Sequence, residues 1–110
     1  MGYNKNMKNI AFDIHGTLDN DPKGILKHYM KLACNFGWTI FVISGPPAER
    51  INKELVKLNI EVPVIVVSVV DYLKDKDIKM WQDDRGNWWC DENKWWVSKG
   101  DICREHGIDI

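Results

Sequence analysis

Three short apolar runs alternate with two amphipathic stretches over the first 70 residues of the chain. The runs at residues 8–14, 38–43 and 63–70 are almost unbroken, which is typical of strands that are covered on both faces. Between them, residues 22–36 and 48–58 carry apolar side chains at helical spacing and charged side chains on the other face. This alternation predicts an α/β fold with a parallel sheet and flanking helices.

The pattern changes beyond the third apolar run. Residues 78–82 and 88–97 are short aromatic and apolar segments, and the turn-forming segment 83–87 separates them. Such a pattern predicts two or three short antiparallel strands. We therefore expect a small tryptophan-rich antiparallel β insertion over about residues 76–97.

The end of the chain returns to a core-like pattern. Residues 98–106 have the pattern of a helix that stops at Gly107, and residues 108–110 resemble the start of one more strand. A length of 110 residues fits a single domain over residues 1–110.

Composition narrows the possible functions. A hydrophobic content of 45% with 28% charged residues is ordinary for a globular protein, and a formal net charge of −1 gives no basic field for a nucleic-acid polymer or a membrane. No apolar run reaches the ~18 residues of a membrane span, so we expect a cytoplasmic protein. The three cysteines form no close pair, which argues against a disulfide framework and against a cysteine-rich zinc site.

Polar residues with phosphate chemistry follow the first two predicted strands. Asp13 ends the first strand, and Ser44 ends the second. Ligands collect at the carboxyl ends of parallel strands, where backbone N–H groups, a hydroxyl and a cation can neutralise a phosphoryl group. The candidate residues of this edge are Asp13, His15, Gly16, Thr17, Ser44, Gly45 and Lys99. A plainer alternative is that Asp13 and Asp21 only cap the next helix.

These motifs together resemble those of the haloacid dehalogenase (HAD) superfamily. Its first motif is an apolar run followed by Asp-x-Asp-Gly-Thr, its second is a strand that ends in Ser or Thr, and its third is a lysine before the last core strand. The resemblance covers nearly the whole chain, with the insertion in the place of a cap. It implies a reduced HAD-like, Rossmannoid sheet, and in an active member Asp13 would be the nucleophile and His15 the acid and base.

The chain departs from that family pattern in two places. His15 stands where phosphatases of the superfamily usually have a second aspartate. The fourth motif, an acidic pair that completes a Mg²⁺ site, would fall after Asp109, and Asp83 and Asp84 are the remaining candidates to replace it. We therefore expect no cofactor for a non-catalytic protein, and Mg²⁺ held by Asp13 only if the protein is an enzyme.

Five of the six tryptophans lie within residues 81–96. Indole faces stack on nucleobases, which makes Trp81, Trp88 and Trp96 candidate ligand contacts. The alternative is that these rings form the core of the insertion or a subunit interface. Because adjacent tryptophans on a strand face opposite ways, we expect a homo-oligomer built partly through the insertion.

The sequence thus favours a non-catalytic protein that binds a phosphorylated small molecule. The tryptophan rings favour a nucleotide as this ligand. A small, degenerate HAD-like domain of this size resembles domains found in bacteriophages. This resemblance implies an anti-defence sponge, a protein that sequesters a nucleotide immune signal in the host cytosol. A Mg²⁺-dependent phosphatase and a protein-interaction module that uses the tryptophan surface remain as alternatives.

Overall fold

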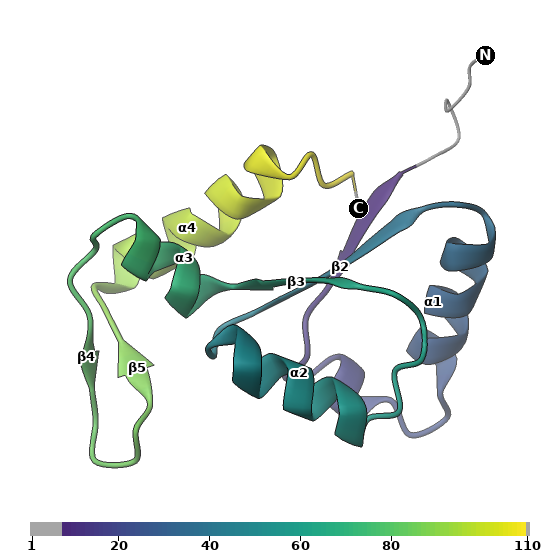
Figure 1. Ribbon diagram of the computed structural model, residues 1–110, viewed down its shortest axis with the longest axis horizontal. Helices are drawn as coiled ribbons and strands as arrows, with labels where there is room; N and C mark the ends of the chain where they lie inside the picture. Colours follow the sequence, from purple (N-terminus) through teal and green to yellow (C-terminus); the bar gives the residue numbers. More distant parts are fainter. Residues whose placement is uncertain (1–7, 110) are drawn as a thin grey trace.

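A three-stranded parallel sheet forms the centre of the molecule, and the computed structural model describes residues 8–109 (Figure 1). The strands are β1 (Asn9–Phe12), β2 (Thr39–Ser44) and β3 (Ile65–Ser68), and their order in the sheet is β1-β2-β3. Both pairs are parallel, with Ser44 in register with Ser68 at the carboxyl edge. The predicted α/β fold with a parallel sheet is confirmed.

Helices cover both faces of the central strand β2. On one face, α1 (Ile25–Asn35) and α2 (Ala48–Lys57) pack against the side chains of Ile40 and Val42. On the other face, α3 (Val69–Asp75) and α4 (Glu92–Glu105) enclose Phe41 and Ile43. This arrangement follows from the alternation of side chains along a strand, and it explains why residues 38–43 are apolar almost throughout.

The first helix begins later than the sequence pattern indicated. Pro22 lies outside α1, after the short 3-10 helix η1 (Leu18–Asn20). The Asp21 carboxylate accepts hydrogen bonds from the backbone N–H groups of Leu26, at 3.0 Å, and Lys27, at 3.2 Å. These donors belong to the first turn of α1, so Asp21 supplies the partners that a helix start lacks.

The third apolar run is only partly a strand, so the prediction of a buried strand over residues 63–70 is confirmed for residues 65–68 and wrong for residues 69–70, which begin α3. β3 ends at Ser68 and is an edge strand, with Ile65 47% exposed. The Ser68 hydroxyl accepts a hydrogen bond from the Asp71 N–H at 3.0 Å and donates one to the Pro46 carbonyl at 2.5 Å. This N-cap starts α3 within a valine-rich segment that favours a strand.

The predicted hairpin is present, but the third strand predicted over the end of the insertion is wrong. β4 (Trp81–Gln82) and β5 (Trp88–Trp89) pair antiparallel. The chain then enters α4, whose N-cap Asp91 accepts a hydrogen bond from the Asn93 N–H at 2.9 Å. The helix predicted over residues 98–106 is the second half of this longer helix, which also contains the last two tryptophans.

The last described residues lie against β1 without forming a regular strand. The Asp109 N–H donates to the Asn9 carbonyl at 2.8 Å, and the Asn9 N–H donates to an Asp109 carboxylate oxygen at 2.9 Å. Gly107, in left-handed conformation with φ +62°, ends the helix as predicted. Ile110, part of the predicted last strand, lies outside the described residues. Within residues 8–109, no helix has both the length and the apolar character needed to cross a membrane.

Candidate functional site

A cleft of about 800 Å³ lies at the carboxyl edge of the sheet. It lies where the β4–β5 hairpin and the first turns of α4 meet the segment between β2 and α2 (Figure 1). We call it the tryptophan cleft, and it is lined by His15, Gly45, Pro46, Pro47, Arg50, Val70, Gly86, Asn87, Trp88, Trp89, Cys90, Glu92, Trp95 and Trp96.

A close contact between Trp95 and Gly45 holds α4 against the sheet edge. A Cβ atom at residue 45 would lie 3.0 Å from Cζ2 and 3.1 Å from Cη2 of the Trp95 ring. Any larger side chain here would press on the Trp95 ring, which would have to move by a few tenths of an ångström. The Gly45 carbonyl accepts a hydrogen bond from the Val70 N–H at 3.1 Å. The cleft is thus joined to the backbone that follows β2.

The loop after β1 is closed on itself by two carboxylates. Asp13 Oδ1 accepts a hydrogen bond from the Ile14 N–H at 2.7 Å. Asp19 Oδ1 accepts one from the Gly16 N–H at 2.7 Å, and Asp19 Oδ2 lies 3.4 Å from His15 Nδ1. The Gly16 N–H, predicted to bind phosphate, therefore has an anionic partner within the chain, and a phosphate at this position would have to displace Asp19.

Ser44 and Ser68 are register partners at the carboxyl edge, yet their hydroxyl groups differ. Both side chains are buried, and the Ser68 hydroxyl has two hydrogen-bond partners. Ser44 Oγ is the single buried side-chain oxygen or nitrogen in the described part of the chain that has none. An unpaired buried hydroxyl costs about 1–3 kcal/mol of folding free energy. Ser44 immediately precedes Gly45, which lines the cleft.

Lysine ammonium groups lie over two of the four lining tryptophans. Lys74 Nζ lies 3.6 Å from the centroid of the Trp88 ring, and Lys99 Nζ lies 5.6 Å from that of Trp96. Each contact combines a cation with the face of an indole ring. The ring faces and the positive charges are therefore concentrated in the same part of the molecule.

Arg50 is the cation of the cleft that sequence reasoning missed. It lies in the first turn of α2, three residues after the Pro46–Pro47 bend, and its side chain is about half exposed. Nothing in the local pattern distinguishes it from the other charged residues of α2, because only the tertiary arrangement places this turn, the hairpin and α4 around one cleft. Glu92 adds one negative charge to the same lining.

Asp83 organises the hairpin turn. Its carboxylate accepts hydrogen bonds from Trp89 Nε1 at 2.9 Å, from the Arg85 N–H at 2.9 Å and from the Asn87 N–H at 3.0 Å. The Trp89 hydrogen bond is the largest cause of a lowered pKa for the Asp83 carboxyl, and the Asn87 N–H is the next. Asp83 therefore fixes the orientation of a lining indole ring.

Two of the carboxylates considered for Mg²⁺ already accept hydrogen bonds within the chain. Asp13 Oδ1 accepts from the Ile14 N–H, and the Asp83 carboxylate accepts from the Arg85 and Asn87 N–H groups. Over residues 8–109, no three histidine, cysteine, aspartate or glutamate side chains are grouped so that they could hold a metal ion.

The cleft brings together part of the predicted site and adds new residues. Of the predicted ligand residues, it is lined by His15, Gly45, Trp88 and Trp96. The predicted residues outside the lining are Asp13, Gly16, Thr17, Ser44, Lys99 and Trp81. The residues it adds include Arg50, Trp89, Trp95 and Cys90. Burial raises the pKa of the Cys90 thiol, with the charge of Asp91 as a second cause.

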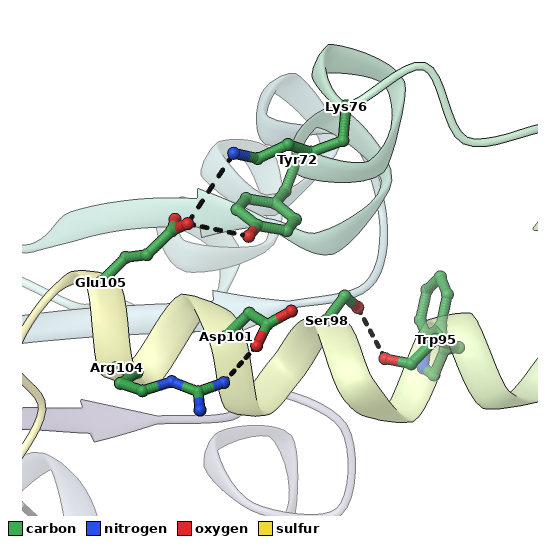
Figure 2. Close-up of polar contacts among 7 residues, drawn as sticks. All are labelled: Tyr72, Lys76, Trp95, Ser98, Asp101, Arg104 and Glu105. Carbon is green, nitrogen blue, oxygen red and sulfur yellow. Dashed lines mark hydrogen bonds and ion pairs between the residues drawn. The ribbon is translucent and has the colours of Figure 1, made fainter.

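A second hollow of about 590 Å³ lies between α3 and α4, and Figure 2 shows its polar side chains. Glu105 Oε1 accepts a hydrogen bond from the Tyr72 hydroxyl at 3.2 Å and lies 3.7 Å from Lys76 Nζ. Arg104 pairs with Asp101 in the same row. Arg50 of the tryptophan cleft also lies 3.9 Å from Glu54, so pairing of charges does not separate the two hollows. The four indole rings make the tryptophan cleft the stronger candidate for an aromatic ligand.

Comparison of the chain with family models, curated proteins and solved structures gives no match.

Proposed function

We propose that the protein binds a phosphorylated small molecule, a nucleotide, in the tryptophan cleft and does not convert it. The observation that carries this proposal is the lining of the cleft, which combines four indole rings with Arg50 and His15 at the carboxyl edge of a parallel sheet. Concave sites of this size with a few convergent polar groups are typical of small-molecule binding.

The indole rings supply the base-binding half of this proposal. Trp89 is 52% exposed and Trp96 is 61% exposed, although both line a hollow. Stacking of a nucleobase on an aromatic ring contributes about 1–3 kcal/mol, so two accessible rings favour an aromatic ligand over a simple phosphate ester.

The phosphate-binding half rests on the cations near those rings. The Arg50 guanidinium offers a planar set of donors that matches a phosphate, and Lys74 and Lys99 add two further positive charges beside Trp88 and Trp96. The unpaired Ser44 hydroxyl, one residue before the cleft, would gain a partner if a phosphate oxygen reached it after a small adjustment of the loop.

The resemblance to the HAD superfamily is consistent with a phosphate at this edge. The resemblance places Asp13, Gly16, Thr17, Ser44 and Lys99 around the anion, but these residues lie outside the lining of the cleft and the Gly16 N–H is bonded to Asp19. The proposal therefore assigns the phosphate first to Arg50 and the base to the lining tryptophans. A protein that binds a nucleotide and releases it unchanged would act by sequestration, as a sponge for a nucleotide signal in the host cytosol. The homo-oligomer predicted through the insertion remains a prediction.

The test is to purify the protein, denature it by heat and analyse the supernatant for released nucleotides. The stripped and refolded protein is then screened by thermal shift against nucleotides, matched nucleosides and inorganic phosphate. We expect a nucleotide to raise the melting temperature more than either of its parts does. If no nucleotide is released and none shifts the melting temperature, the proposal is wrong and a protein-interaction module is favoured.

The alternative phosphatase has one observation in its favour, because Asp13 directly follows β1 at the edge where ligands collect. Incubation of the nucleotide panel with the protein and Mg²⁺ separates the two functions. Release of phosphate that disappears in Asp13→Asn would contradict non-catalytic binding. Unchanged nucleotide after prolonged incubation with a saturating amount of protein would support it.

A further inference from the structure

Helix α1 carries a row of exposed apolar side chains that nothing in the proposed function uses. The exposed fractions are 66% for Ile25, 44% for Tyr29, 45% for Leu32 and 73% for Phe36. Their spacing of four, three and four residues places them on one face of a helix, as in the seam between paired helices. We call these four residues the α1 seam.

The α1 seam is distinct from the face of α1 that packs on the sheet. Met30 and Ala33 are buried in the core, and Leu26 packs against it. At about 100° per residue, the seam lies roughly a quarter turn from that buried face. The apolar surface of α1 is therefore wider than the part of it that the sheet buries. In Figure 1, no other described element lies on the outer side of this helix.

The charged residues of α1 avoid the seam. Lys27 and Lys31 lie on the opposite side of the helix by the same geometry, and Lys27 Nζ donates to the Leu58 carbonyl at the end of α2 at 3.2 Å. The polar residues that border the seam on its free side are His28 and Asn35. An apolar row of this kind without flanking acidic or lysine residues fits another apolar helix rather than a charged partner.

The order of the four side chains fits a second copy of this chain in antiparallel orientation. The spacing is the same when it is read in either direction, so a two-fold axis between residues 30 and 31 places Ile25 opposite Phe36 of the second copy. The same axis places Tyr29 opposite Leu32. Every layer then pairs an aromatic ring with an aliphatic side chain, and the two helix dipoles oppose each other favourably.

The exposed area of the seam sets the size of such a dimer. Together the seam side chains expose roughly 500 Å² per chain, so that covering all of it would bury about 1,000 Å² in total, the smallest area expected of a biological interface. The edge-to-face contact of Tyr29 with Phe12, at 6.2 Å between centroids, holds one seam ring in place before pairing. We propose that the α1 seam is a homodimer interface in which two copies of α1 pack antiparallel.

Sedimentation velocity over a concentration series tests this interface. We expect the wild-type protein to dimerise at high concentration and Leu32→Glu to stay monomeric, because an unpaired carboxylate would be buried in the seam. The matched control is Val56→Glu, since Val56 is 76% exposed on α2 and lies outside the seam. Circular dichroism checks that each variant is folded.

A mixing experiment tests the antiparallel orientation. Tyr29→Lys alone is expected to be monomeric, but an equal mixture with Leu32→Glu should form heterodimers, because the antiparallel axis places the two substituted positions opposite each other with charges of opposite sign. A monomeric wild-type protein, or a mixture that stays monomeric, would overturn the proposal. So would a dimer that survives Leu32→Glu and is lost in Trp89→Ala, since that result would place the interface on the hairpin.

Discussion

The tryptophan cleft and the α1 seam are both exposed and aromatic, but they differ in shape and in the groups beside them. The cleft is concave, and indole N–H groups, Arg50 and two lysines lie in or beside it. The seam is a convex row of four side chains with no charge among them. A small anionic ligand needs convergent polar groups, whereas a helix needs only a periodic apolar row.

The two regions also differ in how the chain builds them. The seam comes from one helix, so a substitution there should change association and little else. The cleft is assembled from the loop after β1, the start of α2, the hairpin and α4, which are distant in the sequence. A substitution in the cleft is therefore expected to change ligand binding, and in some positions the docking of α4 as well.

The largest effect is expected for Trp96→Ala, which removes an exposed ring from the cleft. Nucleotide affinity should fall by roughly 5- to 150-fold, corresponding to about 1–3 kcal/mol of stacking. Titration followed by tryptophan fluorescence measures this loss. The control is Trp81→Ala, because Trp81 is 50% exposed and lies outside the lining. Equal losses in both variants would show that the rings act through the folding of this region and not by stacking.

Gly45→Ala is expected to disturb the joint between α4 and the sheet. Its Cβ would meet the Trp95 ring at 3.0 Å, and overpacking of this kind costs about 1–3 kcal/mol of unfolding free energy. Urea denaturation measures the change. Gly100→Ala is the control, since a Cβ in that position within α4 meets nothing within 4 Å and should stabilise the helix by up to about 1 kcal/mol. A neutral Gly45→Ala would mean that α4 is not held at this contact.

The two edge serines should respond in opposite ways to alanine substitution. Ser68→Ala removes the N-cap of α3 and should cost about 1 kcal/mol of unfolding free energy. Ser44→Ala removes an unpaired hydroxyl and should leave stability unchanged or slightly raised, while nucleotide affinity falls. Urea denaturation and ligand titration on the same two variants measure both quantities. If Ser44→Ala were as destabilising as Ser68→Ala, the Ser44 hydroxyl would have a structural partner in solution.

The smallest effect is a local acid transition of the hairpin. Because hydrogen bonds lower the Asp83 pKa in the folded chain, its stabilising contribution is full above the ordinary carboxyl value of 3.8 and is lost as the pH falls through the lowered pKa. Fluorescence of the hairpin tryptophans should therefore change only below pH 3.8. In Asp83→Asn this change should be absent, and its persistence would assign the transition to another group.

The parallel sheet and the helices α1 and α2 could be predicted from the sequence because their apolar spacing is regular. The segment Val69–Val70 could not, since its β-branched residues favour a strand and only the Ser68 cap turns it into a helix. Trp95 and Trp96 also lie in a helix, although their aromatic side chains favour a strand. The signal that identifies their helix is Asp91 followed by Glu92, an N-cap and an acidic first turn.

The candidate site was predicted in part for the same physical reasons. His15 and Gly45 follow strands, so topology alone places them at the carboxyl edge. Arg50 and the side of each indole that faces the cleft depend on how the hairpin packs, which no local pattern specifies. The closure of the β1 loop by Asp19 also depends on geometry that the spacing of the residues does not reveal.

Calorimetric titration of the wild-type protein tests the central claim most directly. The stripped protein is titrated with the nucleotide that it releases or that shifts its melting temperature most, then with the matching nucleoside and with inorganic phosphate. The account predicts saturable binding of the nucleotide, at least about tenfold tighter than either part, because ring stacking and cation contacts act together. Equal affinity for nucleotide and nucleoside, or no binding of any nucleotide, would contradict it.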